Sequence, residues 1–175
     1  MLSKNIESVL NKQIRIEAES SQVYLSMACW AEIQGLEGVA QFMYKQSDEE
    51  RMHMLKLIKY VNERGSHATI TDLKAPNTTF GTFKQMFEEL YKHELFVSQS
   101  INELVHVAFE EKDYATHNFL QWYVAEQIEE EAQAKTILDK INLIGDDKGG
   151  LYLFDRDIQQ ITVKSSIGMT NNNGK

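Results

Sequence analysis

The sequence predicts an all-α protein, an antiparallel four-helix bundle with one long crossover between the second and third helices and a short C-terminal fifth helix. Three observations support this fold class. Four long stretches carry apolar residues three and four positions apart, the spacing of a helix face. The only proline is Pro76, so these stretches can form uninterrupted helices. The connections between them are short, long and short again, which sets how the helices pair.

Helix ends follow from capping residues. Ser3 is a good N-cap for the first helix, and Asp113 is one for the fourth. Gly35 and Gly65 are suited to stop the first and second helices. The predicted helices span residues 3–34, 37–64, 82–112, 113–144 and 155–167, the last after a polar loop at 146–150. We expect residues 1–168 to form a single domain and 169–175 to be a disordered tail.

The length of each connection sets the topology. A few residues join the first helix to the second and the third to the fourth, so each pair is antiparallel. Residues 66–81 contain turn-forming residues and Pro76, and fully extended they span at most ~54 Å. A 30-residue helix is ~45 Å long, so this connection can return along the whole bundle. The second and third helices are therefore predicted to be parallel.

Composition limits the function classes. The 26 acidic and 18 basic residues give a net charge of −8, which disfavours nucleic acid as a partner and suits cations. The single cysteine, Cys29, excludes an internal disulfide and a Cys-rich metal site, and we expect a buried thiol there. No apolar run is long enough for a membrane span or a signal peptide. We therefore expect a cytoplasmic protein with no membrane partner.

One glutamate lies within the apolar stripe of each long helix, and the four fall at a similar depth. From the turn near residue 36, Glu17 lies ~28 Å down the first helix and Glu50 ~21 Å along the second. From the turn near residue 113, Glu94 and Glu130 lie ~28 Å and ~26 Å away. His53, three residues after Glu50, shares its helix face. The sequence thus predicts a layer of acids with one imidazole at mid-bundle.

Buried carboxylates need a counter-charge, because desolvation costs several kcal/mol per ion. No lysine or arginine lies on these stripes, and protonating every glutamate at pH 7 would need a large pKa shift for each. Two divalent cations would neutralise all four. An oxygen-rich ligand set with one imidazole favours iron or manganese.

At these residues the chain resembles the bacterial non-haem ferritins of the ferritin-like di-iron carboxylate family. The motifs are Glu17 followed by Tyr24, the run Glu49-Glu50-x-x-His53, Glu94, and the run from Trp122 to Glu131. The resemblance covers nearly the whole chain. It implies an iron-storage ferroxidase that oxidises Fe(II) with O₂ or H₂O₂ and keeps the Fe(III) mineral inside a 24-subunit homo-oligomeric shell.

The resemblance also implies roles by position. Glu17, Glu50 and His53 would hold one iron ion, and Glu50 would bridge to a second iron held by Glu94 and Glu130. Two iron ions per subunit are therefore expected.

Other residues of the motifs receive weaker assignments. Gln127 would lie beside the iron ligands. Glu49, Glu126 and Glu129 resemble a third iron site, although a run of acids on a helix is also typical of a solvated face. Tyr24 could hydrogen-bond a ligand or donate an electron, and a half-buried core tyrosine is the alternative.

Departures from related families narrow the prediction. Arg51 follows Glu50 where the haem-binding relatives have their haem-ligating methionine, so no haem is expected even though Met52 is next. The positions matching the acidic pores of animal ferritins are His117 and Leu120, which leaves the iron entry route open. Two alternatives remain, a non-storage di-metal carboxylate oxidase and a DNA-protecting mini-ferritin-like shell.

Overall fold

The computed structural model describes residues 1–160 and contains five α-helices followed by one turn of 3-10 helix. The elements are α1 (Lys4–Ile33), α2 (Glu37–Glu63), α3 (Phe83–Glu110), α4 (Tyr114–Ile144), α5 (Lys148–Asp157) and η1 (Ile158–Gln160). No strand occurs within residues 1–160. The predicted all-α bundle is confirmed. The expected tail at 169–175 and the expected domain end at 168 lie outside the described residues.

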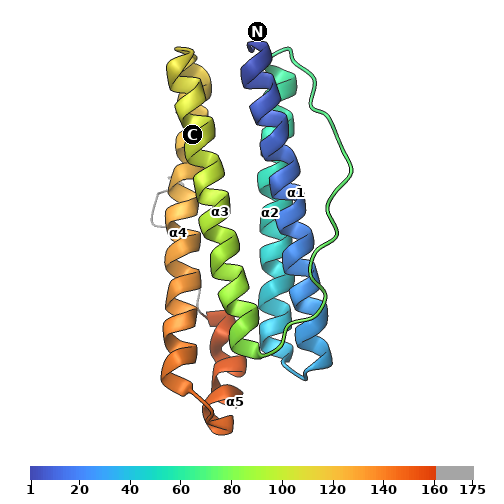
Figure 1. Cartoon of the computed structure of the whole chain (residues 1–175), viewed down its shortest axis with the longest axis vertical. Coiled ribbons are helices and arrows are strands. Elements are labelled where there is room, and N and C mark those ends of the chain that lie inside the picture. Colours follow the sequence, from blue (N-terminus) through green and yellow to red (C-terminus); the bar gives the residue numbers. More distant parts are fainter. Residues whose placement is uncertain (161–175) are drawn as a thin grey trace, which may run out of the picture.

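The four long helices run side by side in two antiparallel pairs, α1 with α2 and α3 with α4 (Figure 1). The connection between α2 and α3 runs down the whole length of the bundle on the outside of α1. It returns the chain to the end where α2 began, so α2 and α3 point the same way (Figure 1). This is the crossover that the connection lengths predicted.

Side-chain caps hold the helix starts where the sequence placed them. The Ser3 hydroxyl accepts the backbone N–H of Ile6, and the Asp113 carboxylate accepts that of Thr116. Each bond satisfies an amide that has no partner inside the helix. The two predicted caps are confirmed.

The apolar core consists of two clusters separated by a polar layer. One cluster lies toward the α5 end and includes Met27, Met43 and Phe87. The other lies toward the chain start and includes Leu10 and Leu57. Between them lie the buried polar side chains of the middle turns, among them Gln13, Glu17, Ser21, Gln46, Ser47, Glu50, His53, Glu94 and Gln127. Burying these polar groups costs free energy unless each has a hydrogen-bonding or charged partner. The partners of this layer are therefore the main question about the bundle.

The fifth helix begins earlier than predicted. It spans Lys148–Asp157 instead of starting at residue 155, and residues beyond 160 are outside the described part. The Asp147 carboxylate accepts the backbone N–H groups of Gly149 and Gly150, which makes it the N-cap of α5. The two glycines suggested a loop, but this cap compensates for their low helix propensity.

One further expectation about a single residue is wrong. The Cys29 side chain is exposed, because residue 29 lies on the outer face of α1. Leu120, whose position matches the acidic pores of animal ferritins, is fully buried in the core of the subunit. Across residues 1–160, no helix is long and apolar enough to cross a membrane.

Candidate metal centre

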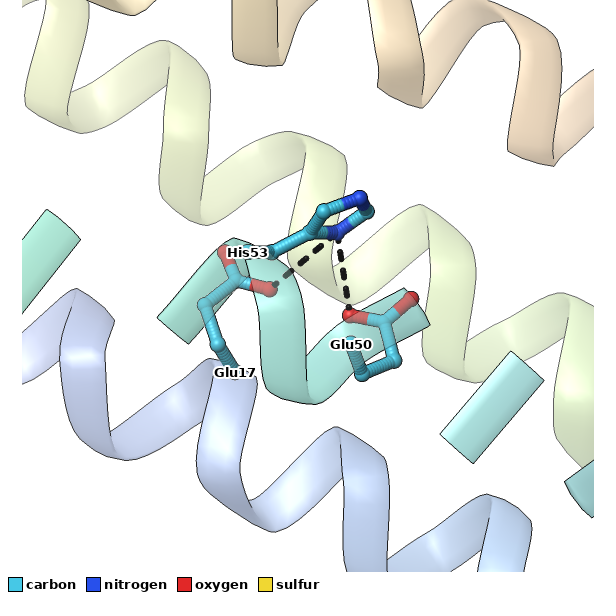
Figure 2. Close-up of side chains that lie close together, drawn as sticks. All are labelled: Glu17, Glu50 and His53. Carbon is cyan, nitrogen blue, oxygen red and sulfur yellow. Dashed lines mark ion pairs between the residues drawn. The ribbon is translucent and has the colours of Figure 1, made fainter. Parts of the chain in front are cut away.

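Glu17, Glu50 and His53 converge in the polar layer (Figure 2). Glu17 comes from α1, and the other two come from successive turns of α2. The His53 Nδ1 atom lies 3.5 Å from Glu50 Oε2 and 4.0 Å from Glu17 Oε2. Within the described chain, this trio is the group of acidic and histidine residues whose possible ligand atoms all lie within 4.8 Å of one another.

Three carboxylate oxygens of this trio are buried without a hydrogen-bond partner. They are Glu17 Oε2 and both oxygens of Glu50. Only 1 % of the surface of each glutamate is exposed, so water does not satisfy these atoms from outside. Unpaired buried carboxylate oxygens are rare and strongly destabilising. Their arrangement around an imidazole nitrogen is a donor set suited to a divalent metal ion.

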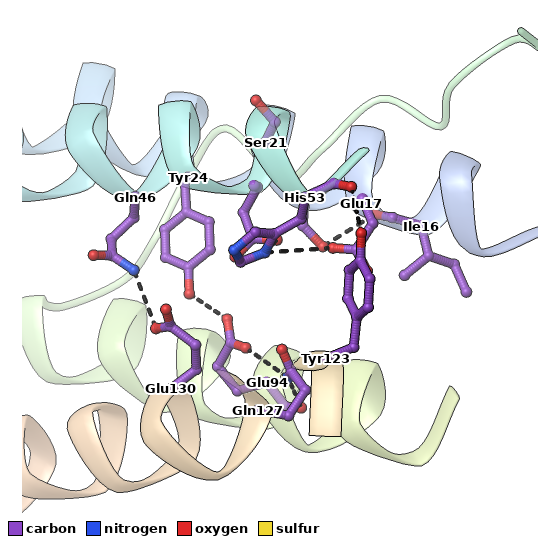
Figure 3. Close-up of polar contacts among 12 residues, drawn as sticks. Ile16, Glu17, Ser21, Tyr24, Gln46, His53, Glu94, Tyr123, Gln127 and Glu130 are labelled. Atoms are coloured by element: carbon purple, nitrogen blue, oxygen red, sulfur yellow. Dashed lines mark hydrogen bonds and ion pairs between the residues drawn. The ribbon is translucent and has the colours of Figure 1, made fainter. Parts of the chain in front are cut away.

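The other two glutamates of the layer are paired with protein donors (Figure 3). Tyr24 donates its hydroxyl to Glu94 Oε1, and Gln127 Nε2 donates to Glu94 Oε2 over 3.2 Å. Gln46 Nε2 donates to Glu130 Oε2 over 3.1 Å. The layer therefore has one half with unpaired oxygens and one half whose carboxylates are held by hydrogen bonds.

Burial makes all four carboxylates reluctant to ionise. Desolvation, followed by the charge of Glu50, holds the pKa of Glu17 well above its ordinary value. The pKa of Glu50 is likewise raised by burial and then by Glu94. Burial raises the pKa of Glu94, and burial together with Glu94 raises the pKa of Glu130 to about 8. A bound cation would favour the ionised forms, so metal binding and proton release are coupled at this layer.

Aromatic residues of α4 hold His53 in place. Trp122 packs edge-on against its ring, with ring centroids 5.2 Å apart, and Tyr123 packs edge-on at 6.2 Å. The Tyr123 hydroxyl also donates to the backbone oxygen of His53 over 2.8 Å. These contacts join α4 to the turn of α2 that carries His53, whose Nδ1 lies beside the two glutamates.

Comparison with known proteins identifies relatives of this chain. A family model described as a ferritin-like domain matches residues 7–144. A probable bacterial non-heme ferritin-like protein of Haemophilus influenzae is 46 % identical over 165 residues, which cover 94 % of this chain and all of the relative. A bacterial non-heme ferritin of Campylobacter jejuni is 45 % identical over 163 residues, covering 93 % of this chain and 98 % of the relative.

The chain belongs to the ferritin family. A crystal structure of an open-pore ferritin from Archaeoglobus fulgidus agrees, with a TM-score of 0.89 and 42 % identity over 90 % of this chain and 98 % of that one. The resemblance seen in the sequence motifs is confirmed. This chain is an iron-storage ferritin, and Glu17, Glu50 and His53 of its polar layer form a group that could hold a metal ion.

The acids assigned to a third iron site lie beside this layer but do not form a compact ligand group in the described residues. Glu49, Glu126 and Glu129 are half-buried, and Glu49 lies 3.5 Å from the Lys45 ammonium. Burial raises the pKa of Glu126, and the charges of Glu129 and Glu49 add to the shift. This ferritin therefore keeps mutually repelling carboxylates next to the centre, and their role stays a prediction.

Several polar residues that organise the layer were not singled out from the sequence. Gln13, Ser100 and Gln46 are buried and hydrogen-bond to the acids or to each other. Tyr123 bonds the backbone of His53. The available signal was a glutamine within an otherwise apolar stripe, because a buried amide needs partners just as a buried carboxylate does.

Proposed function

We propose that this ferritin oxidises Fe(II) at the polar layer before the iron is stored as mineral. The observation that carries the proposal is the set of three unpaired carboxylate oxygens beside His53 Nδ1, buried between two apolar clusters. Such a set lowers the stability of the metal-free protein, and the binding of a divalent cation offsets this loss. Evolved proteins keep costly arrangements of this kind at functional sites.

The unpaired atoms support a specific ligand assignment. The first iron would be held by Glu17, Glu50 and His53, whose free donor atoms already face one another. Glu50 has two free oxygens, whereas Glu17 has one. Glu50 is therefore suited to give one oxygen to each of two ions, and Glu94 and Glu130 would complete the second position.

The chemistry needs two ions because each Fe(II) gives up one electron. Two electrons reduce O₂ to H₂O₂, or H₂O₂ to water, with protons taken up from solution. The protein's part is to fix the distance between the ions, exclude bulk water and leave room for the oxidant. The low exposure of Glu17, Glu50 and Glu94 supports this role.

The two proposed metal positions differ in whether their carboxylate oxygens already accept hydrogen bonds. The first has unpaired oxygens, while both oxygens of Glu94 and Oε2 of Glu130 already accept hydrogen bonds from Tyr24, Gln127 and Gln46. Binding is therefore expected in order, first position before second. Tyr24 and Gln127 would act as hydrogen-bonding neighbours of the ligands. For Tyr24 this favours the role of hydrogen-bond donor to a ligand over that of electron donor.

Assembly completes the storage function. We propose a 24-subunit homo-oligomeric shell without haem, in line with the non-heme names of the relatives. A cytoplasmic location and a third iron at Glu49, Glu126 and Glu129 remain predictions. Native mass spectrometry tests the assembly. A mass near 24 times 20.2 kDa supports storage, while a dimer supports the oxidase alternative.

The ferroxidase proposal is tested by following Fe(II) oxidation under air in the wild type and in Glu50→Gln and His53→Ala variants. Both substitutions remove a donor from the first position, so the rapid phase should disappear. Glu63→Gln, a surface substitution at the end of α2, is the matched control and should leave the rate unchanged. Rapid oxidation that persists in both site variants would show that the centre lies elsewhere.

A further inference from the structure

One hydrogen-bonded chain reaches the metal layer from outside the ligand set. Gln13 lies one turn before Glu17 on α1, and its Nε2 atom donates to Glu17 Oε1 over 2.8 Å. Ser100 on α3 donates its hydroxyl to Gln13 Oε1 over 2.7 Å. All three side chains are buried, with Gln13 and Glu17 each 1 % exposed. These hydrogen bonds therefore link α1 to α3 through the single amide of Gln13.

The direction of this amide is determined by its neighbours. When Glu17 is ionised, as it must be to bind a cation, turning the amide over would place its oxygen against a carboxylate oxygen, and two acceptors would face each other. The ionised Glu17 therefore sets the orientation in which the amide nitrogen faces it. Ser100 holds the other end, because its hydroxyl donates to the amide oxygen.

The consequence is visible in the unpaired atoms. Glu17 Oε1 is occupied by the amide, and Oε2 is left unpaired 4.0 Å from His53 Nδ1. Glu50, which has no such partner, is left with both oxygens unpaired. Two glutamates of the same chemistry thus differ in how many oxygens they can offer.

We infer that Gln13, anchored by Ser100, is a positioning residue that makes Glu17 a one-oxygen ligand and so keeps a coordination position of the first metal open. Without the amide, both oxygens of Glu17 could chelate the same ion. Chelation would fill the position that an oxidant or a bridging oxygen needs. Hydrogen bonds from neighbouring groups commonly tune metal ligands in this way, and their loss costs about tenfold or more in affinity or activity. This inference rests on the proposed function for its catalytic consequence but not for its effect on coordination.

Co(II) is the probe that separates the effect on coordination from the effect on catalysis, because its visible absorption reports coordination number and needs no oxidation. One equivalent of Co(II) is added to the wild type, Gln13→Met, Ser100→Ala and Ser100→Thr, with circular dichroism to show that each is folded. The matched control is Ser20→Ala, which removes the hydroxyl of a different buried serine, on α1, that hydrogen-bonds to His93 and to the backbone oxygen of Ile16.

We expect Gln13→Met and Ser100→Ala to weaken the visible band at least twofold, as a higher coordination number does, and to slow Fe(II) oxidation about tenfold. Ser100→Thr keeps the hydroxyl and should restore both signals, and Ser20→Ala should change neither. If Gln13→Met does not fold, the result for Ser100→Ala decides the test, because this substitution removes a single oxygen atom and perturbs the core least. A wild-type band in Ser100→Ala, or a threonine variant that behaves like alanine, would overturn the inference. A wild type that oxidises no iron would defeat the proposed function while leaving the Co(II) result valid.

Discussion

Gly38 and Asp155 meet at the end of the bundle so closely that only glycine fits at position 38. A Cβ atom there would lie 1.8 Å from the backbone oxygen of Asp155 and 2.7 Å from its carbonyl carbon. Asp155 Oδ1 also accepts the backbone N–H of Val39 over 2.9 Å. The N-cap residue of α2, Leu36, has no side-chain bond of its own, so α5 supplies the missing acceptor. The contact joins the fifth helix to the start of the second.

Replacing Gly38 with alanine should therefore displace α5 and remove the bond to Val39. We expect a loss of about 1–3 kcal/mol in the free energy of unfolding, the usual cost of overpacking. Thermal and urea unfolding of the metal-free protein measure it. Gly149→Ala is the matched control, because its Cβ would meet only the Asp147 side chain at 3.4 Å. Equal stability of the two variants would show that α5 adjusts freely.

The long helices and the acid layer could be predicted because both depend on local, regular geometry. Apolar spacing and the caps Ser3 and Asp113 define helices without any knowledge of the fold. A constant rise per residue then places Glu17 and Glu50 at a common depth. The structure buries both at 1 % exposure, as the stripe positions required.

What the sequence did not reveal depends on contacts between elements or on side-chain direction. The start of α5 was missed because Gly149 and Gly150 are typical of loops, whereas the Asp147 cap shows only in three dimensions. The exposure of Cys29 depends on which way a helix is rotated against its partners. The hydrogen bonds of Gln13 depend on a serine 87 residues away in the chain.

Metal binding should occur in two steps of unequal affinity. The first position has unpaired oxygens, while Glu94 is already bonded to Tyr24 and Gln127. Glu94→Gln should therefore retain the first Co(II) and lose the second, while His53→Ala should weaken the first. Isothermal titration calorimetry of each metal-free variant gives the number and affinity of sites. If the wild type binds the first and second Co(II) ions with equal affinity, the proposed difference between the two metal positions is wrong.

The hydroxyl of Tyr24 should compete with the second metal for Glu94. Tyr24→Phe removes a buried hydrogen bond, which we expect to lower the stability of the metal-free protein by about 1 kcal/mol. It also frees Glu94 Oε1, so the second Co(II) should bind more tightly and the gap between the two affinities should narrow. Calorimetry on the same metal-free samples measures both effects. A weaker second site in Tyr24→Phe would instead mean that the hydroxyl supports the bound metal.

Stability of the metal-free protein should fall as the pH rises. Burial raises the pKa of Glu130 to about 8, well above its ordinary 4.5. Below pH 4.5 the side chain is protonated in both folded and unfolded chains. Between pH 4.5 and about 8 the unfolded chain ionises freely while the folded protein keeps the proton, so stability is lost across this window.

Glu130→Gln removes this titration. The variant should gain stability relative to the wild type between pH 5 and pH 8, by an amount on the order of 1–3 kcal/mol. Unfolding midpoints at the two pH values measure the gain. Glu63→Gln makes the same substitution at an exposed position and is the control. If the difference in stability between Glu130→Gln and the wild type is the same at pH 5 and pH 8, Glu130 is solvated in the metal-free protein.

Trp122 should report the first metal directly. The chain has two tryptophans, and the Trp122 ring lies 5.2 Å from the ring of His53. Trp30 packs edge-on against Phe80 in the apolar cluster toward α5, away from the layer. In a Trp30→Phe background, the first equivalent of Co(II) should quench most of the remaining fluorescence, since a bound paramagnetic ion would lie next to the indole.

The reporter also distinguishes the site from the acid cluster beside it. Adding Glu50→Gln to the Trp30→Phe background should abolish the quenching, because the first position loses the Glu50 carboxylate, which supplies two of its three unpaired oxygens. Adding Glu129→Gln should leave it in place, because that residue belongs to the neighbouring acids. Zn(II), which has no unpaired electrons, should bind without comparable quenching. If Co(II) quenches Trp122 equally with and without the Glu50 carboxylate, the first metal does not bind beside His53.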